Sequence, residues 1–166
     1  MKAATVSEIK RELKTKTTEE LCELCLRLSK FKKENKELLT YLLYEAADEE
    51  SYIQSVKTEM DDQFEEINTT SYYFIKKSVR KILRTVKKYI RYSPHKTTEA
   101  ELLIYFCSSL KEMSPPISRN VTLQNLYDRQ LTMIRKKVST LDADLQYDYG
   151  VPVSYTHLTL PTILRV

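Results

Sequence analysis

Glycine is almost missing from this chain: it occurs once, at Gly150. Gly-rich phosphate loops, dinucleotide-binding turns and tight β-hairpins all need glycine at positions where a side chain would strain the backbone. The sequence therefore excludes these motifs and the nucleotide-dependent activities that depend on them.

Metal ligands and nucleophiles are also scarce, with three cysteines and two histidines in the chain. Cys22 and Cys25 have C-x-x-C spacing, which binds metal when a second pair of ligands stands elsewhere. The second histidine lies in the C-terminal tail described below, so only Cys107 and His95 are left to form that pair. Cys25 and Cys107 fall on apolar helix faces, where cysteine behaves as a small hydrophobe. We therefore expect no metal, no cofactor and no catalytic residue.

No apolar run approaches the roughly 20 residues that span a bilayer. Glu8 stands where the apolar part of a signal peptide would lie. We expect a soluble, cytoplasmic protein that does not use a membrane as its partner.

The sequence does contain helical patterns along almost its whole length. Ser7 is a candidate cap for a short helix over residues 7–15, and Thr17 with Glu20 forms a capping box for the next helix. A polar break at residues 32–35 predicts that this helix and the one after it form an antiparallel hairpin. Further helices are predicted over residues 48–67, 70–92, 97–113 and 119–147.

These patterns predict an all-α fold of six to seven helices, either a single bundle or a short HEAT-like α-solenoid. Residues 1–151 have the length of one ordinary domain, and no internal linker is long enough to separate two. We therefore expect a single helical domain over residues 1–151.

Residues 72–92 contain eight cations and no acid. At roughly 100° per residue, the apolar side chains fall on one face and the cations on the other, with Tyr73 among them and Tyr92 at their edge. Phosphates are attracted to such a stripe, and an exposed tyrosine offers bases a stacking surface. The candidate nucleic-acid-binding residues are Tyr73, Lys76, Lys77, Arg80, Lys81, Arg84, Lys87, Lys88, Arg91 and Tyr92.

The preceding helix weakens this interpretation, because residues 48–66 carry eight acids against a single Lys57. Two helices joined by the short link at residues 68–69 are expected to pack antiparallel, with opposite charges flanking their seam. Surface ion pairs of this kind contribute only about 0–1 kcal/mol each, but they would neutralise the field that a nucleic acid feels. We therefore favour a solvated or internally paired basic face. Nucleic acid is the first alternative, and an acidic protein or membrane surface is the second.

The last predicted helix carries apolar residues at alternating spacings of four and three, as in a heptad seam. The seam covers fewer than the roughly three to four heptads that identify a coiled coil, so we favour an ordinary helix packed on the core. Self-association is the alternative, and its candidate residues are Leu131, Ile134, Val138, Leu141 and Leu145.

The end of the chain has a different character. Residues 153–162 read VSYTHLTLPT, which resembles one reading frame of a transposase-type sequencing adapter, and Pro152 fits the same frame. The resemblance implies that residues 152–162 are translated adapter, that residues 163–166 are read-through, and that the natural chain is truncated near Val151. Without this tail, which holds one of the 27 cations and no acid, 26 cations face 23 acids, a balance that implies no partner by itself.

Residues 1–151 carry no motif set that identifies a family. The interpretation that we favour is a non-enzymatic protein-interaction module whose partner is another protein, with homo-oligomerisation through the last helix as one form of it. The alternative is a nucleic-acid-binding protein that uses the basic helix over residues 72–92.

Overall fold

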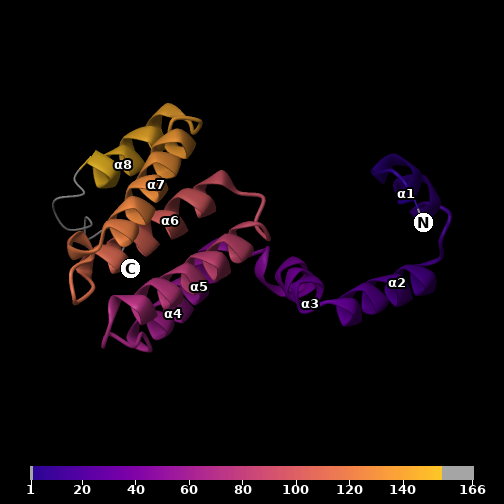
Figure 1. Cartoon of the computed structure of the whole chain (residues 1–166). Coiled ribbons are helices and arrows are strands. Elements are labelled where there is room, and N and C mark those ends of the chain that lie inside the picture. Colours follow the sequence, from indigo (N-terminus) through magenta and orange to yellow (C-terminus); the bar gives the residue numbers. More distant parts are fainter. Residues whose placement is uncertain (1, 155–166) are drawn as a thin grey trace. The chain divides into compact units, whose positions relative to one another are not determined.

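The structure, a computed structural model, describes residues 2–154. Within this range it holds eight α-helices and no strand, so the prediction of an all-α fold is confirmed, with more helices than the six to seven expected (Figure 1). The helices are α1 (Val6–Leu13), α2 (Thr18–Phe31), α3 (Lys33–Thr40), α4 (Glu49–Glu65), α5 (Tyr72–Ile90), α6 (Lys96–Glu112), α7 (Val121–Val138) and α8 (Ala143–Ser154). A π-helical turn spans Tyr41–Glu45 and a short 3-10 helix spans Ile117–Arg119. The adapter-like tail lies outside the described residues from residue 155 onward.

The chain divides into two compact units, Met1–Ala46 and Ala47–Val166, hereafter unit 1 and unit 2. The expectation of a single domain over residues 1–151 stays a prediction. Each unit is described by itself.

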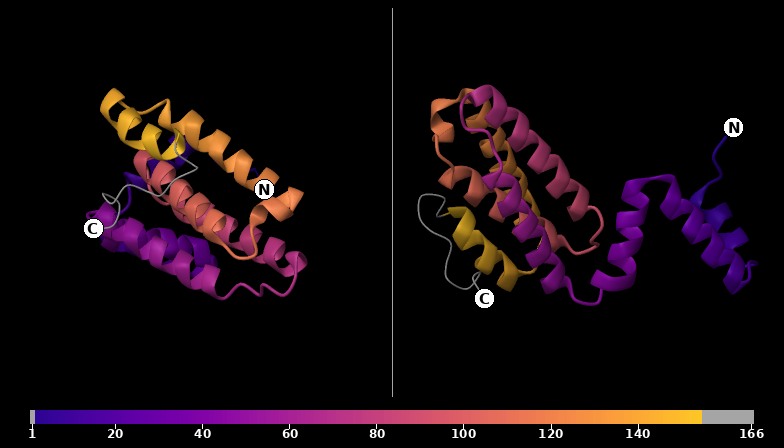
Figure 2. Two further views of the ribbon diagram at one scale, coloured as in Figure 1. Left: turned by 90° about the vertical axis from the view of Figure 1, so that its left-hand side faces the viewer. Right: turned by 90° about the horizontal axis from the view of Figure 1, so that it is seen from below.

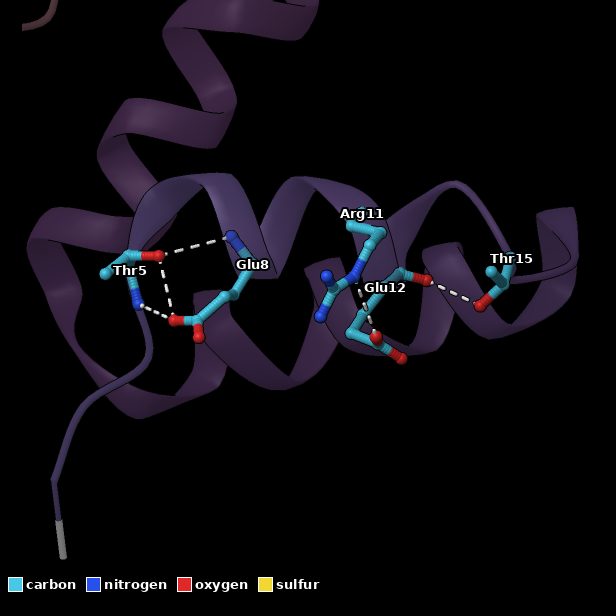
Figure 3. Close-up of polar contacts among 5 residues, drawn as sticks. All are labelled: Thr5, Glu8, Arg11, Glu12 and Thr15. Atoms are coloured by element: carbon cyan, nitrogen blue, oxygen red, sulfur yellow. Dashed lines mark hydrogen bonds and ion pairs between the residues drawn. The ribbon is translucent and has the colours of Figure 1, made fainter.

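Unit 1 begins with two capped helices. At α1 the cap is Thr5, and not Ser7 as predicted: the Thr5 backbone N–H donates to Glu8 Oε2 at 2.7 Å, and the Glu8 N–H donates back to Thr5 Oγ1 at 3.3 Å (Figure 3). The bond from the Thr5 backbone lowers the pKa of the Glu8 carboxyl. The predicted capping box of Thr17 and Glu20 is confirmed, with the reciprocal bonds at 2.9 and 3.2 Å. The first backbone N–H groups of a helix have no partner within the helix. Here a threonine side chain accepts a hydrogen bond from one of them, which explains why α1 and α2 start where they do.

The break between α2 and α3 is a single residue. Lys32 is extended, with φ −142° and ψ 144°, and the two helices meet there at a corner (Figure 2). Asn35 Nδ2 spans the corner and donates to the Leu28 carbonyl oxygen at 2.9 Å. None of the residues of α1, α2 or α3 is buried, so these helices do not enclose a core of their own.

Unit 2 is organised around α6, which contacts α4, α5, α7 and α8. Such a central helix must be apolar around most of its circumference, and α6 accordingly buries residues from Thr98 to Leu110 on several sides. The apolar sides of α4 and α5 face this core, and for α5 this is the face that the sequence predicts. The buried hydrophobic side chains of these three helices are Tyr52, Ile53, Val56, Met60, Ile75, Val79, Ile82, Val86, Ala100, Leu102, Leu103, Ile104, Phe106, Cys107 and Leu110.

The prediction of one helix over residues 119–147 is wrong, because the chain turns between Val138 and Ala143. Ser139 and Thr140 turn their hydroxyls back to the Lys136 and Lys137 carbonyl oxygens, at 2.8 and 2.7 Å. Beyond the turn, Gln146 Nε2 donates to the Leu141 carbonyl oxygen at 2.6 Å. Side-chain bonds of this kind compete with the helical ladder and favour its end.

Candidate functional site

The orientation of α5 is set by its apolar face. Ile75, Val79, Ile82 and Val86 are buried, so the cations on the opposite side point away from the core. Of the eight predicted cations, those at residues 77, 80, 81, 84 and 91 are exposed, and those at residues 76, 87 and 88 are half-buried.

The cationic side of α5 forms an open groove of about 660 Å³. Its lining consists of one tyrosine, one leucine and five cations: Tyr73, Lys76, Lys77, Arg80, Leu83, Arg84 and Lys87. We call this surface the α5 groove. The predicted candidates at residues 73, 76, 77, 80, 84 and 87 therefore come together on one surface.

Three acids of α4 accept hydrogen bonds from hydroxyl groups. Glu59 accepts a hydrogen bond from the Tyr89 hydroxyl at 2.8 Å, and Asp61 accepts from the Tyr105 hydroxyl at 2.7 and 2.9 Å. Glu49 accepts from the hydroxyls of Ser93 and Thr98. These bonds place the three acids beside hydroxyl groups, and the expectation that opposite charges flank the α4–α5 seam stays a prediction.

The five cations of the groove make no ion pair with a carboxylate anywhere in the part of the chain that the structure describes. Lys87 Nζ lies 3.9 Å from Met133 Sδ of α7. The positive charge of the groove thus remains available to an external anion.

The two predicted tyrosines differ in their surroundings. Tyr73 is 68% exposed, and its ring meets that of Phe74 edge to face, with centroids 5.4 Å apart. Tyr92 is only 9% exposed, and its ring lies 6.0 Å from that of Tyr89. The prediction that Tyr92 stands at the edge of the cationic face is therefore wrong: α5 ends at Ile90, so Tyr92 no longer follows the helical repeat and turns into the core.

The α5 groove continues toward a second open groove on α7. This second groove has a volume of about 610 Å³ and is lined by Asn125, Asp128, Arg129, Thr132 and Met133. The two grooves adjoin at the contact between Lys87 and Met133.

The candidate residues for self-association are buried or half-buried. Leu131, Ile134 and Val138 are buried in unit 2. Leu141 is half-buried in the turn that ends α7, and Leu145 is half-buried on α8. These five residues therefore do not form one continuous seam for a second copy. The interpretation of this segment as packed on the core is the one that the burial supports.

Sequence reasoning missed a buried ion pair between α4 and α6. Lys57 Nζ lies 2.6 Å from Glu101 Oε1, both side chains are buried, and the ammonium also stands 5.4 Å from the centroid of the Tyr105 ring. The phenol of Tyr149 lies close enough that, after burial itself, the charge of Glu101 raises its pKa. The helical period could have indicated this burial. Lys57 falls on the same side of the helix as Ile53, Val56 and Met60, whereas a surface lysine would fall on the opposite side.

The cysteines and histidine do not gather. Cys22 and Cys25 are exposed, His95 is exposed, and Cys107 is buried, which raises the pKa of its thiol to about 12. Among the described residues, the structure contains no cluster of three or more His, Cys, Asp or Glu side chains suited to a metal ion. No helix in residues 2–154 combines the length and the apolar character needed to cross a membrane.

Comparisons with known proteins give no relative for this chain. No protein-family model, no curated protein and no solved structure matches it.

Proposed function

We propose that this protein is a non-enzymatic binding module that takes nucleic acid in its α5 groove. The observation that carries the proposal is the row of five cations along the groove, none of which is paired with a carboxylate in the described residues. A polyanion that neutralises such cations releases its condensed counterions, and this release supplies most of the affinity of non-specific nucleic-acid binding. The exposed ring of Tyr73 at the same surface is suited to a base.

The sequence alone favours a basic face on residues 72–92 that is solvated or paired with acids of the same chain, and nucleic-acid binding is the first alternative. We now prefer that alternative. That face was favoured because the α4 acids were expected to cancel the α5 cations. In the described residues, however, none of the five cations of the groove forms an ion pair with a carboxylate. The reason for discounting nucleic acid is therefore weakened.

The test is the salt dependence of binding to a labelled oligonucleotide. If all five cations contact phosphates, the slope of log K against log salt is about −3.5 for a single strand, at roughly 0.7 per contact. Affinity then falls about 100-fold between about 50 and 200 mM salt. The triple variant Lys77→Gln, Arg80→Gln, Arg84→Gln keeps two contacts, so its slope is about −1.4.

The matched control removes the same charge from unit 1. Lys10, Lys14 and Lys30 are exposed and unpaired in the described residues, and the variant with all three changed to Gln should keep a slope close to that of the unchanged chain. Equal slopes for both triple variants, or no binding at low salt, would contradict the proposal.

A second candidate function, protein interaction, is favoured by the exposed apolar side chains of unit 1. Leu21, Leu24, Leu28 and Phe31 follow heptad spacing on α2, and Leu28 and Phe31 are 59% and 78% exposed. Contiguous exposed apolar surface marks interaction sites in soluble proteins. We propose a second copy of the chain as the partner.

The charges of α2 support this partner. Its acids, Glu19, Glu20 and Glu23, lie in the first half, and its cations, Arg27 and Lys30, lie in the second. Two α2 helices that approach antiparallel therefore set acidic halves against basic halves, whereas a parallel approach sets like charges together.

Sedimentation equilibrium over a range of concentrations tests this second candidate. The unchanged chain should dimerise, and Leu24→Glu with Leu28→Glu should give a monomer of equal helix content, because neither side chain is buried. Oxidation should also join two chains through Cys25, which is exposed near the middle of α2, but not through buried Cys107. A chain that stays monomeric at every concentration would exclude self-association as the function of this surface.

A further inference from the structure

We infer that the α5 groove selects single-stranded nucleic acid by stacking an unpaired base on Tyr73. The inference rests on the proposed function and adds the class of ligand to it. A row of cations alone would take a duplex, a single strand or an acidic protein, so the selection has to come from the aromatic end of the groove.

The geometry places an aromatic ring at one end of the phosphate row. Tyr73 is the first lining residue, and the last cation, Lys87, follows fourteen residues later, about 21 Å along the helix at 1.5 Å per residue. Lys77, Arg80, Arg84 and Lys87 recur at intervals of three to four residues, and Lys76 stands beside Lys77. The five cations therefore share one side of α5 with the tyrosine. A backbone bound along this row brings a base at its end to the Tyr73 ring.

The Tyr73 ring is accessible to a base. It is 68% exposed, and it meets the Phe74 ring edge to face. Phe74 is 43% exposed, but its ring stands nearly perpendicular to that of Tyr73 and it is not a lining residue of the groove, so the stacking face is that of Tyr73. Protein aromatic rings stack on bases that are free of a duplex, because paired bases are already stacked on one another.

The α7 groove limits the length of the site. Beyond Lys87 the surface passes to Met133 and then to a rim that carries both Arg129 and Asp128. Asp128 repels phosphate and offsets the attraction of Arg129. The row of phosphate contacts therefore ends near Lys87, which corresponds to roughly four to six nucleotides, near the lower end of the range of about 4–16 known for single-strand sites.

The experiment compares one labelled sequence as a single strand and as a duplex, at low salt, by fluorescence anisotropy. The unchanged chain should bind the single strand more tightly. Tyr73→Ala should weaken single-strand binding about fivefold or more and leave duplex binding unchanged. Tyr73→Phe keeps the ring and should restore single-strand affinity. The side chain is largely exposed, so neither substitution disturbs the core.

A second readout locates the base. An oligonucleotide that contains 5-iodouracil should form a light-induced crosslink at Tyr73 or Phe74, identified by mass spectrometry, and the crosslink at residue 73 should disappear in Tyr73→Ala.

The outcomes separate the inference from the proposed function. Equal binding of both forms, unaffected by Tyr73→Ala but weakened by the triple Gln variant, would overturn the single-strand inference and leave the proposed function standing. Binding of poly-aspartate without binding of either nucleic acid would overturn both, and would assign the groove to an acidic protein.

Discussion

The buried pair of Lys57 and Glu101 should be the most costly ionic contact to break in the described part of the chain. Both side chains are buried between α4 and α6, and the two charged atoms are 2.6 Å apart. Lys57→Met removes the ammonium but keeps most of the volume, and it leaves the Glu101 carboxylate buried without its counter-charge. Breaking one side of a buried pair costs about 3–5 kcal/mol, a large part of the roughly 5–15 kcal/mol that holds a domain folded.

Urea denaturation followed by far-UV circular dichroism measures this cost, and the chain supplies a matched control. Lys137 pairs with Glu99 at 2.9 Å, also on α6, but its side chain is 42% exposed. Lys137→Met should therefore cost only about 0–1 kcal/mol. The double variant Lys57→Met, Glu101→Leu should recover most of the stability lost in Lys57→Met, because it leaves no buried charge unpaired. The reasoning is refuted if Lys57→Met costs no more than Lys137→Met.

Three further predictions concern the core of unit 2. Burial raises the pKa of the Cys107 thiol from its ordinary 9.0 to about 12, so the unfolded chain loses this proton first as pH rises. The free energy of unfolding should then fall above pH 9 by up to about 1.4 kcal/mol per pH unit relative to Cys107→Ala, and parallel pH profiles of the two chains would show the thiol to be accessible. A thiol reagent at mildly alkaline pH should modify Cys22 and Cys25 in the native chain and Cys107 only in urea; rapid reaction of all three would contradict its burial. Ile134→Ala should cost about 2–5 kcal/mol in urea denaturation, because Ile134 is fully buried, and a cost below 1 kcal/mol would place it on the surface instead.

Local chemistry made much of the fold predictable. Thr17 and Glu20 set the start of α2 through bonds between near neighbours, and the stripes of α4 and α5 follow from the helical period. The prediction of one last helix over residues 119–147 was wrong because it relied on the same helical period. Leu141 and Leu145 keep the heptad spacing across the turn at residues 139–142, so periodicity alone cannot detect the break. Residues that turn a hydroxyl back to the backbone, Ser139 and Thr140, were the local signal for it.

The candidate site was predictable only in part. The helical wheel gathered the cations and Tyr73 on one face, and the structure brings six of these residues into one groove. What the α4 acids bond to depends on tertiary contacts, since Tyr105 reaches Asp61 from another helix, 44 residues away. The burial of Tyr92 likewise depends on where α5 ends, and element boundaries are the least certain part of any pattern.

The most direct test of the central claim is an NMR titration of the isotope-labelled chain with a short single-stranded oligonucleotide at low salt. Binding in the α5 groove predicts that backbone signals of Tyr73, Lys77, Arg80 and Arg84 shift progressively, with smaller changes at the buried face of the same helix. Shifts confined to other helices, or unchanged spectra in excess oligonucleotide, would contradict the claim that this groove binds nucleic acid.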